Sequence, residues 1–125
     1  MNQASTSIGV DIIEISRIKR AVSRWNDAFL KRVYSQAELD YCRSMYPSLA
    51  ARFAAKEAVI KTLGRGGSGF SWLEIEILPG PNDAPYVKLS GRARRKAEEL
   101  GLKDLSISLS HCNEYAVAFS VGHAE

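Results

Sequence analysis

The segment from Leu49 to Leu63 constrains the fold more than any other part of the chain, because alanines are interspersed there with larger apolar residues. Pro47 suits the first turn of a helix, and Gly64 is placed to end that helix in a left-handed conformation. A helix of this composition must be largely buried, with Leu49, Phe53 and Ile60 as its core stripe. We therefore predict a long central helix on which the rest of the chain packs.

The residues before this helix predict one strand and two shorter helices. Residues 8–13 form a short apolar run interrupted by Gly9 and Asp11, which is typical of a buried strand. Apolar residues then recur at spacings of three and four, as on one side of an amphipathic helix, at Ile15, Ile18, Val22 and Trp25. Residues 35–38 read Ser-Gln-Ala-Glu, a capping box that begins a helix through about Arg43.

After the central helix the pattern changes from helical to extended. A glycine-rich loop at 64–69 is followed by expected strands at 72–78 and 86–89, a helix at 91–100, and a hairpin of strands at 105–110 and 115–121. This order predicts an α+β fold in which an antiparallel sheet packs with the long central helix. The length of 125 residues suits one domain, which we assign to residues 8–125 after a polar tail at 1–7.

The composition narrows the range of partners without choosing one. A formal charge of +3 and a pI near 9.0 favour anionic partners such as nucleotides, acidic proteins or nucleic acid. No apolar run approaches the roughly 18 residues that span a bilayer, and the first residues lack an apolar signal region, so we expect a cytoplasmic location and no membrane partner. Cys42 and Cys112 lack metal or redox spacing and are expected to be reduced thiols.

Two carboxylates far apart in the sequence suggest a metal site. Glu57 and Lys61 lie one turn apart on the central helix, and such a spacing is also that of an ordinary surface ion pair. Asp11, however, lies in an apolar run where an unpaired charge would be costly, and it therefore calls for a cation or several donors. Magnesium takes hard oxygen ligands and often only one or two protein carboxylates. Asp11 and Glu57 would suffice, with phosphates and water completing the shell.

Three stretches stand out together: Gly-Val-Asp-Ile at 9–12, Arg-Phe-Ala-Ala-Lys-Glu-Ala-Val-Ile-Lys at 52–61, and Ser-Leu-Ser-His at 108–111. In this order they resemble the holo-acyl-carrier-protein synthases, the short, single-domain phosphopantetheinyl transferases, over residues 8–121. The resemblance implies magnesium-dependent transfer of 4'-phosphopantetheine from coenzyme A to a serine of an acidic apo acyl carrier protein in fatty acid biosynthesis, with release of adenosine 3',5'-bisphosphate. It also implies a homotrimer with active sites between subunits.

The resemblance also implies roles for individual residues. Asp11 and Glu57 would hold magnesium, and Glu57 and Lys61 would be catalytic, with Glu57 as our candidate acceptor of the serine proton. The residues expected to bind coenzyme A are Arg52, Lys56, Lys61, Gly64, Gly66 and His111. The first helix carries Arg17, Arg20 and Arg24 on one face, where the family docks its acidic carrier protein; a merely solvated basic face is the alternative.

Other functions remain to be weighed. A polyketide or peptide synthase carrier is an alternative acceptor for the same chemistry. A docking subunit without activity would keep the basic helix but not Asp11, Glu57 and Lys61. A nucleic-acid-binding module is the remote alternative, since Gly-Arg-Gly-Gly at 64–67 matches a G-x-x-G loop. Such a loop should connect two helices, whereas a strand is expected here, so no nucleic-acid partner is predicted. Arg65 replaces the threonine often found in the family's Gly-Thr-Gly.

Overall fold

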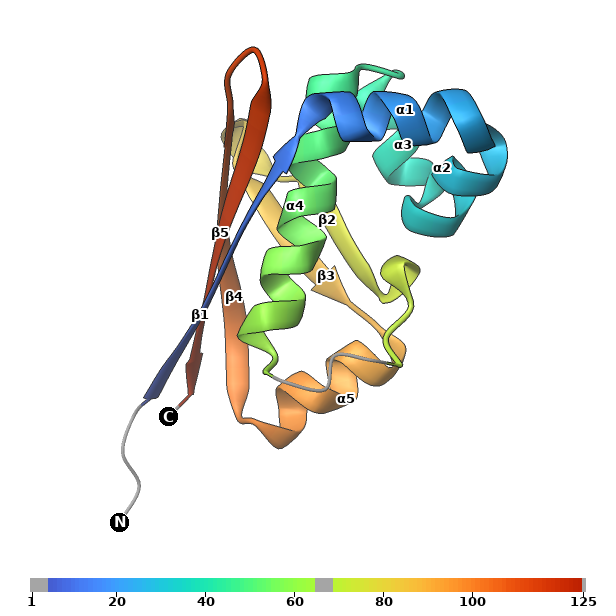
Figure 1. Ribbon diagram of the computed structural model, residues 1–125. Coiled ribbons are helices and arrows are strands. Elements are labelled where there is room, and N and C mark those ends of the chain that lie inside the picture. Colours follow the sequence, from blue (N-terminus) through green and yellow to red (C-terminus); the bar gives the residue numbers. More distant parts are fainter. Residues whose placement is uncertain (1–4, 65–68, 125) are drawn as a thin grey trace.

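The structure is a computed structural model that describes residues 5–64 and 69–124. A long helix, α4, lies across one face of a three-stranded antiparallel sheet, and a two-stranded hairpin and the other helices surround it (Figure 1). The helices are α1 (Ile15–Trp25), α2 (Asp27–Val33), α3 (Gln36–Cys42), α4 (Tyr46–Thr62) and α5 (Gly91–Glu99). The strands are β1 (Ser5–Glu14), β2 (Ile75–Pro79), β3 (Pro85–Leu89), β4 (Leu102–His111) and β5 (Tyr115–Ala124). The predicted α+β architecture is confirmed.

The larger sheet has the strand order β1-β5-β4, so the C-terminal strand lies between the other two. Asp11 on β1 is opposite Ala118 on β5, which is in turn opposite Leu109 on β4. Because side chains alternate between the faces of a strand, this row and the row of Ile13 and Ala116 point toward α4. The register therefore fixes Asp11 on the face that the central helix covers.

Small residues let α4 approach the sheet closely. Ala50, Ala54, Ala55 and Ala58 are completely buried along the helix. At Gly9 on β1, a Cβ atom would lie only 1.9 Å from the carbonyl oxygen of Ala58. The predicted core stripe was therefore only partly right. Phe53 and Ile60 are half-buried, because alanines make the closest contacts of a helix packed on several sides.

Local signals mark several boundaries correctly. Both hydrogen bonds of the capping box form, from Glu38 N to Ser35 Oγ and from Ser35 N to Glu38 Oε1. Gly64 adopts the predicted left-handed conformation, with φ of 95°.

Among the helices of the described residues, none has the length and apolar character that crossing a bilayer requires.

Other boundaries differ from the prediction. Strand β1 begins at Ser5 instead of residue 8, because pairing with β5 continues as far as Ala124. Helix α2 was not predicted; it begins after Asn26, whose φ of 50° turns the chain at the end of α1. A 3-10 turn occupies residues 72–74, so strand β2 starts at Ile75, three residues later than expected.

Candidate active site

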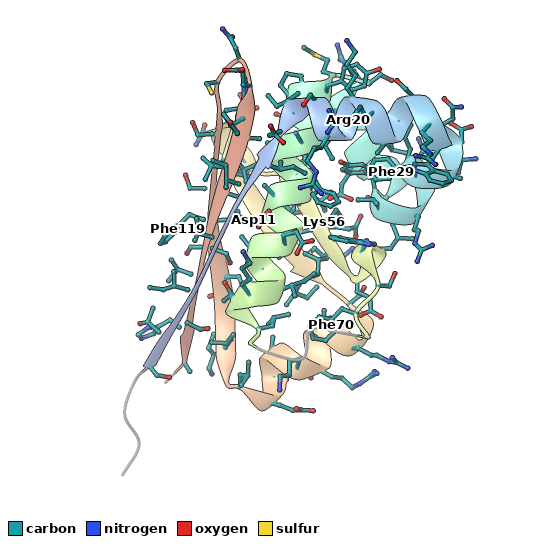
Figure 2. The ribbon with its side chains drawn as sticks, in the orientation of Figure 1. Asp11, Arg20, Phe29, Lys56, Phe70 and Phe119 are labelled. Atoms are coloured by element: carbon teal, nitrogen blue, oxygen red, sulfur yellow. The ribbon has the colours of Figure 1, made fainter. Side chains whose placement is uncertain are left out.

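Three of the predicted site residues come together between β1 and α4. Lys61, in the last turn of α4, donates a hydrogen bond of 3.1 Å from Nζ to Oδ1 of Asp11 and one of 2.9 Å to the carbonyl oxygen of Val10. Asp11 is half-buried beside the helix, while Lys61 is exposed (Figure 2). The sheet register and the last turns of α4 thus join residues fifty positions apart.

Glu57 completes this group with a second carboxylate. Burial raises the pKa of Glu57 above its ordinary value, the negative charge of Asp11 raises it further, and the positive charge of Lys61 lowers it. The two carboxylates are therefore close enough to repel each other, and the ammonium of Lys61 offsets part of this repulsion. Such a pair fits a hard divalent cation, since magnesium accepts two carboxylates and fills its shell with water or phosphate oxygens. Within the described residues, no cluster of three or more acidic, histidine or cysteine side chains offers a metal site.

Lys56 lies elsewhere, in the core between α3, α4 and β2 (Figure 2). Its ammonium and the carboxylate of Glu38 are fully buried and 2.8 Å apart. Lys56 Nζ also donates to the carbonyl oxygens of Trp72 and Ile75. An ammonium has three hydrogens, and all three are used within the protein. We therefore correct the predicted coenzyme A contact of Lys56: the side chain has neither access to solvent nor a donor left for a phosphate.

Arg52 is a buried cation that has no anionic partner among the described residues. The residue is only 7% exposed, and its guanidinium lies over the ring of Tyr41, with Cζ 4.4 Å from the ring centroid. Its Nη1 donates a long hydrogen bond of 3.4 Å to Ser48 Oγ, and its Nε has no hydrogen-bond partner. No carboxylate of residues 5–64 or 69–124 lies within ion-pair distance of it. A desolvated guanidinium with unused donors is suited to bind an anion.

The remaining predicted ligand residues are spread out. His111 is exposed at the end of β4 and is separated from β1 by the intervening strand β5, so a single chain does not bring it to Asp11. Gly64 directly follows the last turn of α4, close in sequence to Lys61. Gly66, like Arg65, lies outside the described residues.

The arginines of α1 form an exposed basic face. Arg17, Arg20 and Arg24 are all exposed, and Figure 2 labels Arg20 on α1. Trp25 was predicted to join the core stripe, but it is 55% exposed at the end of α1. The Arg24 guanidinium lies 5.0 Å from its ring centroid. The stripe ends early because the chain turns at Asn26, and the periodicity alone gave no sign of this.

On the outer face of the larger sheet, β1 and β5 present apolar side chains that no described residue covers, while β4 presents serines. Val10 is opposite Phe119, and the neighbouring row pairs Ile12 with Val117. Ile8, Val10, Ile12 and Phe119 are all exposed, and Phe119 points away from α4 (Figure 2). A contiguous apolar face of this kind is typical of a surface that contacts another protein chain.

Comparison with known proteins agrees with this arrangement. A family model described as the 4'-phosphopantetheinyl transferase superfamily matches residues 7–120. The fold and the family match thus place the chain in the class of phosphopantetheinyl transferases.

Individual relatives narrow the class. A holo-[acyl-carrier-protein] synthase of Dehalococcoides mccartyi strain CBDB1 is 58% identical over 113 residues, which cover 90% of this chain and 94% of the relative. One from Herpetosiphon aurantiacus is 47% identical over 121 residues, covering 91% and 95%. The crystal structure of the Helicobacter pylori holo-[acyl-carrier-protein] synthase in complex with coenzyme A is 38% identical, with a TM-score of 0.83 and coverage of 92% and 98%. The chain belongs to the holo-acyl-carrier-protein synthase family, as its three motifs predicted.

Proposed function

We propose that this chain transfers the 4'-phosphopantetheine group of coenzyme A to a serine of an apo acyl carrier protein and releases adenosine 3',5'-bisphosphate, as a step of fatty acid biosynthesis in the cytoplasm. The observation that carries the proposal is the convergence of Asp11, Glu57 and Lys61 between β1 and α4. Family membership supports the reaction class, and the solved relative with coenzyme A supports the donor. A polyketide or peptide synthase carrier is the alternative acceptor for the same chemistry.

Asp11 and Glu57 would hold Mg²⁺. When bound, the ion would neutralise charge on the pyrophosphate of coenzyme A as the phosphorus–oxygen bond breaks. Lys61 supplies a second positive charge from an exposed ammonium, which can turn from Asp11 to a phosphate oxygen. Glu57 is also our candidate acceptor of the proton of the attacking serine hydroxyl; the raised pKa of its carboxyl group in the metal-free chain supports this role.

The nucleotide part of coenzyme A would engage the remaining cations. Arg52 offers a buried guanidinium whose Nε has no hydrogen-bond partner among the described residues. An anionic phosphate would supply both a hydrogen-bond acceptor and a negative charge. Gly64 ends α4 near Lys61, and it is proposed to contact the same ligand together with Gly66. His111 would contribute from a different subunit, since β5 separates it from Asp11 within one chain.

A homotrimer is part of the proposal. The exposed apolar side chains of β1 and β5, which include Val10 and Phe119, support a trimer. Strand β1 also carries Asp11, on its opposite face. Covering the apolar face with neighbouring copies would bury these side chains and place active sites between subunits. The carrier protein would instead approach α1, where Arg17, Arg20 and Arg24 favour an acidic surface.

One experiment tests the reaction directly. The chain is incubated with coenzyme A, magnesium and an apo carrier protein, and the carrier is analysed by mass spectrometry for the added phosphopantetheine. We expect the modification with the wild-type chain, and its loss when the metal is chelated or when Asp11→Ala is used. An unmodified carrier in the complete mixture, with a folded enzyme, contradicts the proposal; modification by the chelated enzyme contradicts only the role of magnesium.

A further inference from the structure

The buried ion pair of Glu38 and Lys56 connects three parts of the fold. Glu38 Oε1 accepts hydrogen bonds from Lys56 Nζ at 2.8 Å and from Ser35 N at 2.9 Å, while Oε2 accepts one from Ile77 N at 2.8 Å. The ammonium of Lys56 in turn donates to two carbonyl groups just before and at the start of β2. One glutamate and one lysine thus tie α3, α4 and β2 together.

These contacts lie at the exit of the glycine-rich segment. Trp72 and Ile75, whose carbonyl oxygens accept from Lys56, are the first residue of the 3-10 turn and the first of β2. The ring of Trp72 also stacks on Phe53, one turn before Lys56, with a centroid separation of 4.9 Å. Gly64 directly follows α4, and Trp72 packs on the same helix through Phe53. Both ends of the segment are therefore held against α4.

The pair also sets the rotation of α4 about its axis. Successive residues of a helix point about 100° apart, so a helix that directs Lys56 toward β2 directs the next residue, Glu57, toward a neighbouring side. In this structure that side faces β1, because Lys61, one turn further along the same face of α4, donates a hydrogen bond to Asp11. A fixed Lys56 consequently fixes the direction of the carboxylate beside it.

Stability alone does not account for a charged pair at this position. Burying two charges removes both from water, and a well-packed apolar pair of similar volume is often as stable. Hydrogen bonds, in contrast, are directional. They hold α4 at one rotation about its axis and hold Trp72 and Ile75 in one position, where apolar packing would allow several arrangements.

We propose that Lys56, held by Glu38, is a positioning residue: it anchors the return of the glycine-rich segment to α4 and aims Glu57 at Asp11. The inference rests on the proposed transferase function, because its consequence is measured on coenzyme A. Lys56 acts through its neighbours and touches no substrate.

Two variants separate anchoring from stability. Glu38→Gln weakens the charge pair but leaves the bonds from Lys56 to the two carbonyl groups. Glu38→Gln with Lys56→Met removes those bonds as well, without leaving a buried charge unpaired. Ala97→Gly, in a buried position of α5, is the stability control. Each chain is measured at the same number of degrees below its own melting temperature.

Hydrogen exchange of residues 70–77 and the kinetics of transfer are measured together. We expect the double variant to fold, to lose at least tenfold protection at residues 70–77, and to show a KM for coenzyme A raised at least tenfold. Glu38→Gln should show smaller changes, and Ala97→Gly none in either quantity. Unchanged protection, or a KM within twofold of the wild type, overturns the positioning role. A wild-type chain that transfers nothing instead refutes the proposed function, and the positioning role with it.

Discussion

Gly9→Ala is the substitution with the clearest consequence for both fold and site. The added Cβ atom would lie 1.9 Å from the carbonyl oxygen of Ala58, 2.7 Å from Thr62 Oγ1 and 2.9 Å from the carbonyl carbon of Ala58. Two of these atoms belong to the backbone of α4, so no side-chain rotation relieves the overlap. Strand and helix must move apart, and Asp11 is only two residues along the same strand.

The expected loss of stability follows from this overlap. Overpacking a well-packed core costs about 1–3 kcal/mol, and contact with rigid backbone places this site at about 3 kcal/mol. The unfolding entropy of 125 residues is about 0.26 kcal/mol/K, so the melting temperature should fall by roughly 11 °C. The proposed metal site should also weaken, because the separation of β1 and α4 sets the distance between its carboxylates.

Thermal and urea unfolding of Gly9→Ala should be compared with Gly64→Ala as the matched control. A Cβ atom at Gly64 meets nothing within 4 Å, but its φ of 95° is unfavourable for alanine, so that variant isolates the backbone effect, about 1–2 kcal/mol. If Gly9→Ala is no less stable than Gly64→Ala, the close approach of β1 and α4 is wrong, and with it the geometry proposed for Asp11 and Glu57.

Further predictions concern the site and its partners. Asp11→Asn should lower the pKa of Glu57, because it removes a negative charge that raises it; NMR titration of the metal-free carboxyl group checks this, and an unchanged pKa contradicts the proximity of the two groups. Transfer by the wild type at a fixed magnesium concentration should fall as the pH drops, since protons compete with the metal for Glu57 and protonation also removes the base. Reversing Arg17 and Arg20 to glutamate should weaken carrier binding by at least tenfold in calorimetry and leave coenzyme A binding intact; unchanged carrier affinity argues against docking on α1. Phe119→Glu should shift the mass in light scattering from trimer to monomer, whereas a fully active wild-type monomer refutes the assembly.

Features defined by neighbouring residues were predictable from the sequence. The capping box at 35–38 and the left-handed Gly64 depend on hydrogen bonds and backbone angles within a few residues, and both are confirmed. Helix α2 and the exposure of Trp25 were missed, because both depend on the turn at Asn26, and the prediction followed the apolar spacing instead of the turn preference of asparagine. The meeting of Asp11 with Lys61 needed the register of β1 and its contact with α4, which periodicity alone does not contain.

The two lysines of the central motif show why residue type and spacing do not determine a role. Lys56 and Lys61 are five residues apart on α4, so they point about 140° apart around the helix. Where α4 runs between β1 and β2, the side chain of Lys56 points into the core. Its buried positive charge requires a buried carboxylate, which Glu38 provides. Lys61 points to the opposite side and reaches solvent beside Asp11, although the next residues, Thr62 and Leu63, are fully buried. A lysine can meet a phosphate only at the second position, so the direction of each side chain around α4, set by how the helix packs, decides which lysine is available to a ligand.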